Sequence, residues 1–296
     1  MPDQTAATPT ATARRVLAQH KALRDDIADL VTRRPLPGPD IDMLDPFLFL
    51  NHHGPQTYAP DNGGLPFGPH PHRGFETVTF ILQGELSHSD SGGHESIIRA
   101  GGVQWMTAGS GLVHAELSPA DFKRRGGPLE ILQLWVNLPS RLKMTPPHYI
   151  GLQQDEIPAF PANGGRATVN LIAGAWDGHT APIQSLGDVT MTTIALVAGA
   201  RLTLPVAPGR AVFLYVVRGA VAVAGTAAPG FTLVELDDSG DAVDLAATAD
   251  SLVVFGHAPP LREPVVAHGP FVMTTREEIT QAMDDYRAGR FGGLAG

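Results

Sequence analysis

Short apolar runs separated by turn residues dominate the middle of the chain. Between Phe75 and Glu116, runs of apolar and β-branched residues are broken repeatedly by glycine-rich turns. The turns are Gln83-Gly84, Asp90-Ser91-Gly92-Gly93, Gly101-Gly102 and Thr107-Ala108-Gly109-Ser110-Gly111. Runs of this kind bounded by turn residues predict β-strands, and their regular recurrence predicts a closed or sandwiched antiparallel barrel.

A second copy of this pattern lies farther along the chain. Residues 78–86 resemble residues 212–221 when Gly84 is aligned with Gly219, an offset of 135 residues (219 minus 84). Because an offset of this size matches a domain length, the sequence predicts two barrels.

The two ends of the chain predict different structures. The apolar spacing within residues 12–34 permits a helix, which Pro35 would end. Near the other end, Thr275 and Glu278 have the spacing of a capping box, and apolar residues follow at helical spacing as far as Gly289. One C-terminal helix is therefore expected.

Together these patterns predict an all-β protein with two antiparallel β-barrel or jelly-roll domains and a C-terminal helix. The predicted parts are an N-terminal extension (1–40), a first barrel domain (41–140), a second barrel domain (141–262) and a C-terminal segment with the helix (263–296). Pro205 and Ala207 stand where the first copy has His70 and His72. The second barrel is therefore expected to lack the metal ligands of the first.

Composition and charge exclude several classes of function. The chain has no cysteine, which excludes thiolate ligands, disulfides, iron–sulfur clusters and cysteine nucleophiles. The formal charge of -9 and the pI of about 5.7 give no basic footprint for direct binding of nucleic acid or an anionic membrane, although a protein partner stays compatible. No apolar stretch approaches the roughly 18 residues of a membrane span, and the N-terminus lacks a signal-peptide pattern. A cytoplasmic protein is therefore expected.

Two pairs of candidate metal ligands are found among the 12 histidines and the acidic residues. His70 and His72 are separated by one residue, as are His114 and Glu116, which begin 42 residues later (114 minus 72). Such pairs project from the same face of a strand. Imidazole and carboxylate ligands with open positions suit Fe(II), Mn, Ni, Cu or Zn. The alternative is that the four side chains form a polar strand face at a water-filled barrel mouth.

The spacing alone does not decide the oxygen ligand. Glu76 lies four residues after His72, keeps the same strand parity and could bind in place of Glu116. The glutamate that does not bind could fix a histidine tautomer. Trp105 and Met106 could either wall an aromatic pocket or belong to the core.

The other histidines carry weaker signals. His52 and His53 are adjacent, so at most one of them can face a cavity that holds the metal. Seven more are expected to be solvated or hydrogen-bonded groups: His20, His88, His94, His148, His179, His257 and His268.

Several long runs of the chain closely resemble the pirins, which are two-domain members of the cupin superfamily. The matching runs are Asp45-Pro46-Phe47-Leu48, His70-Pro71-His72-Arg73-Gly74-Phe75-Glu76-Thr77-Val78-Thr79, Gln104-Trp105-Met106-Thr107-Ala108-Gly109-Ser110-Gly111-Leu112-Val113-His114-Ala115-Glu116, Glu263-Pro264-Val265-Val266 and Gly269-Pro270-Phe271-Val272-Met273-Thr274-Thr275-Arg276-Glu277-Glu278-Ile279. The resemblance covers most of residues 45–290 and implies a bicupin fold.

The resemblance also implies the ligands. The pirin metal ligands fall on His70, His72, His114 and Glu116, with Glu76 as a neighbour, and the implied metal is iron, held in the N-terminal domain alone. The chain departs from the pattern at residues 51–54, where Asn-His-His-Gly replaces a common Asp-His-Phe-Gly run.

Two functions follow from the resemblance. Several pirins are similar to flavonol dioxygenases, which open the central ring of quercetin with O2 and release carbon monoxide. In such an enzyme Glu116 would take the proton of the flavonol 3-hydroxyl. Other pirins resemble non-catalytic, iron-dependent redox sensors that bind a protein partner. Isomerase or hydrolase chemistry is a weaker third alternative, because one fold hosts many functions.

Overall fold

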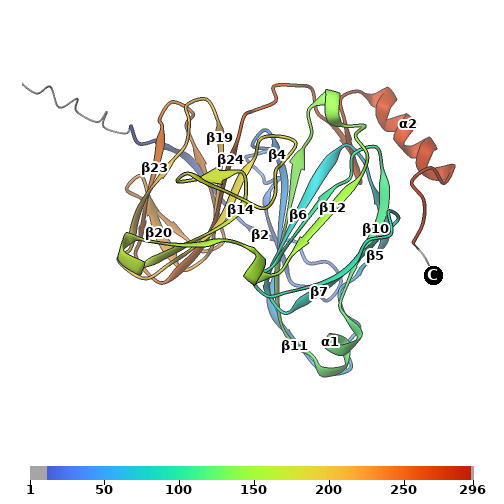
Figure 1. The fold of residues 1–296 in the computed structure, drawn as a ribbon, viewed down its shortest axis with the longest axis horizontal. Helices are drawn as coiled ribbons and strands as arrows, with labels where there is room; N and C mark the ends of the chain where they lie inside the picture. Colours follow the sequence, from blue (N-terminus) through green and yellow to red (C-terminus); the bar gives the residue numbers. More distant parts are fainter. Residues whose placement is uncertain (1–11, 295–296) are drawn as a thin grey trace, which may run out of the picture.

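Two seven-stranded antiparallel sheets pack face to face in the computed structural model, which describes residues 12–294 (Figure 1). Each large sheet is backed by a four-stranded sheet, so the protein consists of two barrels side by side. Phe47 of one large sheet packs on Phe213 of the other, with ring centroids 5.2 Å apart. The predicted all-β architecture is confirmed.

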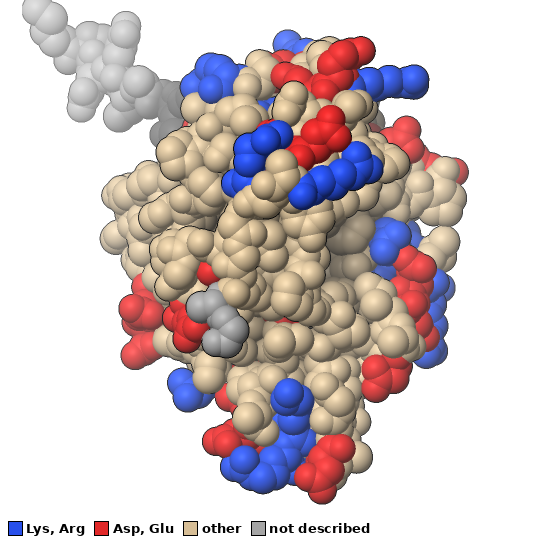
Figure 2. Space-filling view, turned by 90° about the vertical axis from the view of Figure 1, so that its right-hand side faces the viewer, with Lys and Arg blue, Asp and Glu red and all other residues tan. Residues whose placement is uncertain are grey.

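The first barrel combines a sheet of order β12-β9-β6-β11-β4-β3-β2 with a sheet of order β5-β10-β7-β8. Its strands are β2 (Leu23–Arg24), β3 (Thr32–Leu36), β4 (Phe47–Tyr58), β5 (Phe67–His72), β6 (Phe75–Gln83), β7 (Glu85–Asp90), β8 (Glu95–Arg99), β9 (Val103–Thr107), β10 (Leu112–Leu117), β11 (Gly127–Asn137) and β12 (His148–Leu152). Helix α1 (Ala120–Arg125) forms its lower tip (Figure 1). Charged side chains gather there in Figure 2, but Arg124 pairs with Asp121 and Arg125 with Glu85.

The second barrel has the sheet orders β1-β22-β19-β24-β17-β14-β13 and β18-β23-β20-β21. Its strands are β1 (Val16–Lys21), β13 (Ala159–Ala162), β14 (Ala167–Ala173), β17 (Thr190–Leu196), β18 (Arg201–Pro205), β19 (Ala211–Arg218), β20 (Ala220–Val223), β21 (Thr226–Pro229), β22 (Thr232–Leu236), β23 (Ala242–Ala247) and β24 (Ser251–Ala258). Three 3₁₀ turns and a small ribbon complete the linking segments: η1 (Ser140–Leu142), η2 (Gln154–Glu156), η3 (Asn163–Gly165), β15 (Ala175–Trp176) and β16 (His179–Thr180). Buried aliphatic side chains make up most of the core of this barrel.

A hairpin and a helix end the chain. The hairpin consists of β25 (Val266–His268) and β26 (Phe271–Met273), and helix α2 spans Arg276–Arg287. Thr275 caps α2 and forms the predicted capping box with Glu278. The C-terminal helix is therefore confirmed. Among the described residues, neither α-helix is long and apolar enough to cross a membrane.

The spacing within residues 12–34 permits a helix, but this prediction is wrong. This segment forms β1, β2 and β3. In β1 the side chains alternate, because His20 is buried while Lys21 is exposed, and the strand pairs with β22. Pairing with a sheet edge therefore outweighs local helical spacing. Residues 1–11 of the predicted extension lie outside the described residues. Strand β1, within the predicted extension, pairs in the second barrel, and β12, within the predicted second domain, pairs in the first barrel.

The glycines aligned by the internal repeat occupy equivalent corners. Gly84 lies between β6 and β7, and Gly219 lies between β19 and β20; in each barrel the chain passes there from the large sheet to the small one. Their φ angles are +82° and +80°. Positive φ strains a residue with a Cβ, so glycine is required at both corners.

His52 lies between the barrels and not in a metal cavity. Its Nδ1 pairs with the Tyr215 hydroxyl over 2.9 Å, and its Nε2 pairs with Glu130 Oε1 over 3.0 Å. Arg218 of the second barrel approaches the other oxygen of Glu130 to 3.2 Å. His53 faces the opposite side of β4, where its Nδ1 pairs with Thr32 Oγ1. The adjacent histidines thus face opposite sides, as expected for a strand.

Candidate metal centre

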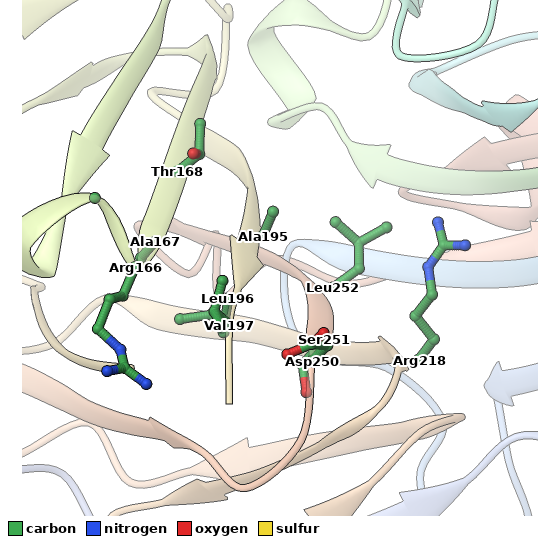
Figure 3. A pocket seen from close by; sticks show the side chains of 11 residues that line it. Arg166, Ala167, Thr168, Ala195, Leu196, Val197, Arg218, Asp250, Ser251 and Leu252 are labelled. Atoms are coloured by element: carbon green, nitrogen blue, oxygen red, sulfur yellow. The ribbon is translucent and has the colours of Figure 1, made fainter. Parts of the chain in front are cut away.

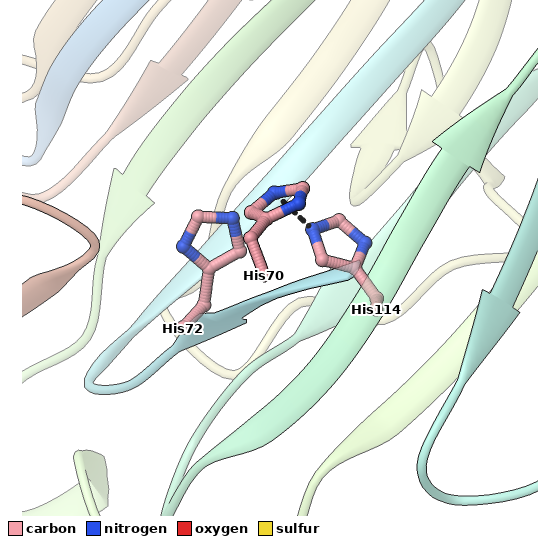
Figure 4. Close-up of side chains that lie close together, drawn as sticks. All are labelled: His70, His72 and His114. Atoms are coloured by element: carbon pink, nitrogen blue, oxygen red, sulfur yellow. Dashed lines mark hydrogen bonds between the residues drawn. The ribbon is translucent and has the colours of Figure 1, made fainter. Parts of the chain in front are cut away.

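Three histidines converge at one end of the first barrel (Figure 4). His70 and His72 lie on β5 and His114 lies on β10, and antiparallel pairing places His114 directly opposite His70. One ring nitrogen from each lies within 4.8 Å of the other two. The Nε2 atoms of His70 and His114 are 2.9 Å apart. Two imidazoles at right angles on one ion, each about 2.1 Å from it, have their nitrogens about 3 Å apart.

Hydrogen bonds orient two of the rings. His70 Nδ1 donates to the carbonyl of Gly68 over 2.7 Å, and His72 Nδ1 donates to the carbonyl of Pro270 over 3.3 Å. Both bonds leave an Nε2 lone pair free for an ion. His72 Nε2 is buried and finds no hydrogen-bond partner among the described residues. A buried polar nitrogen without a partner is costly, so these residues fit a metal ion.

Burial shifts two of the rings toward the neutral form that metal ligation requires. Burial, with a smaller contribution from the neighbouring His70, lowers the pKa of His72 to about 3. Burial also lowers the pKa of His114 well below its ordinary value, assisted by His72, His70 and His88. Neutral imidazoles offer lone pairs without repelling a cation.

Glu116 lies outside the three-histidine group. It is buried, and it follows His114 by two residues on β10, which keeps it on the same face. Thr79 Oγ1 donates to its Oε1 over 3.1 Å, and Gln133 Nε2 donates to its Oε2 over 2.5 Å. Trp135 Nε1 in turn donates to Gln133 Oε1 over 3.3 Å. The structure therefore places the Glu116 carboxylate in the same barrel, fixed by a short polar chain.

Glu76, the alternative oxygen ligand that the spacing left open, lies on β6 and not on the strands that carry the histidines. The turn at Arg73-Gly74 separates β5 from β6, so counting parity from His72 across it is not valid. Glu76 shares its face of β6 with Val78, which packs between the two large sheets. It accepts a hydrogen bond from Thr107 Oγ1 over 2.7 Å, and burial raises the pKa of its carboxyl group.

His88 is hydrogen-bonded, as expected from the sequence, but its buried position beside His114 and its partner Asp90 were missed. His88 is buried on β7 with its ring centroid 5.5 Å from that of His114, and it stacks on Tyr149 at 4.0 Å. Its Nε2 donates to Asp90 Oδ2 over 3.0 Å. Burial alone would raise the pKa of Asp90, but hydrogen bonds from His88 and His94 hold it at about 2. The sequence pattern that could have identified them is the spacing of His88 and Asp90, which are separated by one residue on the strand after Gly84 and so share a face.

An aromatic group borders His72. The ring of Phe75 lies 5.0 Å and that of Trp135 lies 5.3 Å from the imidazole, and the two aromatic rings are 4.4 Å apart. Trp105 belongs instead to the core between the large sheets, whereas Met106 packs with Tyr149 near His88. The tryptophan beside the histidines is therefore Trp135 and not Trp105.

A separate cavity of about 400 Å³ lies in the second barrel (Figure 3). Arg166, between η3 and β14, and Arg218 of β19 border it, and Ser251 and Leu252 of β24 lie between them. None of the three converging histidines lines it. It is therefore distinct from the metal centre.

Comparison with known sequences assigns the family. The sequence model of the family described as Pirin matches residues 29–136, and that of the Pirin C-terminal cupin domain matches residues 191–292. The chain belongs to the pirin family. One match falls mainly on each barrel, so the two barrels are the two cupin domains of a pirin, and the implied bicupin fold is confirmed.

Three pirin relatives illustrate the range of names. A pirin-like protein of Caulobacter vibrioides is 42% identical over 268 residues, which cover 90% of this chain and 94% of that protein. A crystal structure of quercetin 2,3-dioxygenase from Acinetobacter baumannii is 34% identical with a TM-score of 0.90, and the match covers 96% of this chain and 100% of the other. A crystal structure of a bacterial pirin from Escherichia coli in complex with nickel(II) is 23% identical with a TM-score of 0.66. That match covers 82% of this chain and 99% of the other.

Proposed function

We propose that this pirin is a metal-dependent dioxygenase that opens flavonols such as quercetin with O2. Fe(II) is the proposed working metal, and Mn, Ni, Cu and Zn are the other ions that such ligands accept. The observation that carries the proposal is the convergence of three imidazoles, among which the buried Nε2 of His72 has no hydrogen-bond partner among the described residues. The similarity to a quercetin 2,3-dioxygenase across nearly the whole chain supports the substrate class.

His70, His72 and His114 would hold the ion, and Glu116 is the proposed fourth ligand. When bound, the ion would supply a Lewis acid for the substrate oxygen and the redox chemistry for O2. Glu116 follows His114 by two residues on the same strand face, so its carboxylate faces the same barrel interior. Its present partners, Thr79 and Gln133, both donate to it, so each of its two oxygens is held by one hydrogen bond.

The same carboxylate is the proposed proton acceptor. An ionised Glu116 can take the proton of a flavonol 3-hydroxyl at Oε1, where Thr79 is the present donor. Trp135 beside His72, backed by the fully buried Phe75, would give the site an apolar aromatic side for such a substrate. Such rings fit a flavonol better than a small polar acid.

The test is flavonol-dependent oxygen uptake by protein loaded anaerobically with Fe(II), with the metal content measured on the same sample. We expect turnover in the wild type and neither metal nor turnover in His70→Ala. Glu116→Gln separates the two roles, because loss of metal marks a ligand, whereas full metal without turnover marks a proton acceptor alone. Wild-type protein with stoichiometric iron and no oxygen uptake would refute the dioxygenase.

A non-catalytic, iron-dependent redox sensor that binds a protein partner is the second candidate. It is favoured by the relative of 42% identity, which is named as pirin-like and not as an enzyme. The negative net charge of the chain suits a basic protein partner better than nucleic acid. Pull-downs with oxidised and reduced iron-loaded protein test it, and identical recovered partners would count against it.

A further inference from the structure

The C-terminal segment, defined here as residues 263–294, leaves the second barrel and packs on the metal-binding end of the first. Phe271 and Met273 of the hairpin and Ile279 of α2 form an apolar cluster with Val113 of β10. Figure 1 shows α2 alongside β10 and β5. These are the strands that carry the three histidines.

This segment is hydrogen-bonded to the main chain immediately after His72. The Val272 N–H donates to the Arg73 carbonyl over 3.1 Å. Lys143 Nζ donates to the carbonyls of both Gly74 and Val272, over 2.8 and 3.0 Å, and so joins the turn to the hairpin. Gly74 has a φ of +90°, and a Cβ at that position would overlap the Val272 carbonyl oxygen. The close approach therefore requires glycine.

The side chain of Arg73 ties the same turn to helix α2. Arg73 Nη1 lies 2.7 Å from Asp285 Oδ2, and its Nε donates to the Ser110 carbonyl over 2.7 Å. The guanidinium also lies over the ring of Phe291, 4.6 Å from its centroid. Arg73 is buried, so this ion pair is largely shielded from water.

The hairpin also contacts a metal-ligand candidate directly. The Pro270 carbonyl accepts from His72 Nδ1 over 3.3 Å and from the Arg73 N–H over 3.4 Å. A donor bond from Nδ1 keeps the proton on that nitrogen and leaves the Nε2 lone pair for the ion. The acceptor for an N-terminal ligand thus comes from a segment 198 residues away.

We propose that the C-terminal segment is a positioning element of the metal centre. Asp285 anchors Arg73, the anchored turn holds the hairpin, and the Pro270 carbonyl fixes the tautomer and orientation of His72. The inference rests on the proposed metal site and does not depend on flavonol turnover. Loss of an outer partner of a ligating histidine typically weakens metal binding about 10- to 100-fold.

The test compares Asp285→Asn with Asp284→Asn. Asp284 is its neighbour on α2 and pairs only with Arg287 at the surface, so it controls for charge and helix position. Titration with Ni(II) alone should show a dissociation constant at least about 10-fold weaker in D285N, with a shifted ligand-field spectrum, and no change in D284N. In the metal-free protein, two-bond ¹⁵N–¹H correlations should show His72 protonated at Nδ1 in the wild type and mixed tautomers in D285N.

Three outcomes would overturn the inference. They are a wild-type protein that binds no Ni(II), a D285N protein with wild-type affinity and spectrum, and an unchanged His72 tautomer in D285N. If D285N does not fold, Asp285→Glu keeps the charge with one more methylene and should give an intermediate affinity; wild-type affinity there with a lowered melting temperature would assign Asp285 to stability alone. If D285N weakens nickel binding while the iron-loaded wild type takes up no oxygen, the result would support this inference and refute the dioxygenase.

Discussion

The Nε2 atoms of His70 and His114 lie 2.9 Å apart, although the residues are 44 positions apart in the chain. The pairing of β5 with β10 brings them directly opposite each other. Two bare nitrogen lone pairs at this distance repel each other, so a proton or a cation must lie between them. Because His70 already donates through Nδ1 to Gly68, a metal ion satisfies both rings without disturbing that bond.

Replacing either member of this pair should abolish metal binding. We expect His114→Ala to lose bound metal and all metal-dependent oxygen uptake, because two histidines alone bind weakly. His148→Ala, at an exposed position of β12, is the matched control and should retain both. Metal analysis after dialysis against a weak chelator measures the effect. Full metal content in His114→Ala would refute the proposed site.

Glu76→Gln should leave metal binding intact. The glutamate faces the packing between the large sheets, and burial raises the pKa of its carboxyl group, so a neutral amide of the same size removes a charge that burial disfavours. We expect the free energy of unfolding at neutral pH to stay equal or to rise. Chemical denaturation with metal analysis tests this. A loss of metal in Glu76→Gln but not in Glu116→Gln would reverse the assignment of the two glutamates.

The repetition of strands, the C-terminal helix and the candidate histidines could be read from the sequence because each depends on local spacing. Spacing could not choose between Glu76 and Glu116, because a turn at Gly74 separates β5 from β6 and strand parity does not continue across a turn. The role of residues 12–34 was missed because strand pairing with β22 is not visible in the spacing of β1 itself. The contact of Pro270 with His72 spans 198 residues, so no local pattern could reveal it.

Gly74→Ala should destabilise the protein more than Gly93→Ala. Both glycines have positive φ, +90° and +87°, so each substitution adds backbone strain of about 1 kcal/mol or more. A Cβ at Gly93 meets nothing within 4 Å, whereas one at Gly74 overlaps the Val272 carbonyl oxygen and must push the hairpin away. We expect a total of roughly 3 kcal/mol or more at Gly74 from strain plus overpacking. Urea unfolding of the metal-free proteins measures both, and equal losses would contradict the contact.

Tyr215→Phe should weaken the interface between the barrels. The variant removes the hydroxyl partner of the buried His52 Nδ1, and leaving such a group unsatisfied costs about 1–3 kcal/mol. Tyr286→Phe at an exposed position of α2 is the control, with an expected change within about 0.5 kcal/mol. Denaturant midpoints give the comparison. Similar small changes in both variants would show that the His52 contact contributes little.

Lys143 should give the stability of the protein an unusual dependence on alkaline pH. Burial lowers the pKa of this lysine to about 8 in the folded protein, against the ordinary 10.5 that it regains on unfolding. Between these values the unfolded chain binds more protons, so the contribution of Lys143 to the free energy of unfolding rises with pH through this window. The penalty for holding the charged amine is fully present below pH 8 and is removed by pH 10.5. A neutral amine has two N–H groups for three acceptors, which are Asn137 Oδ1 and the carbonyls of Gly74 and Val272, so it loses one of these bonds. We expect the free energy of unfolding of the wild type, relative to that of Lys143→Met, to rise by up to about 3 kcal/mol over the window. Urea unfolding of both proteins at several pH values tests this, and a difference that stays constant or falls with pH would show that the lysine titrates normally in the folded state.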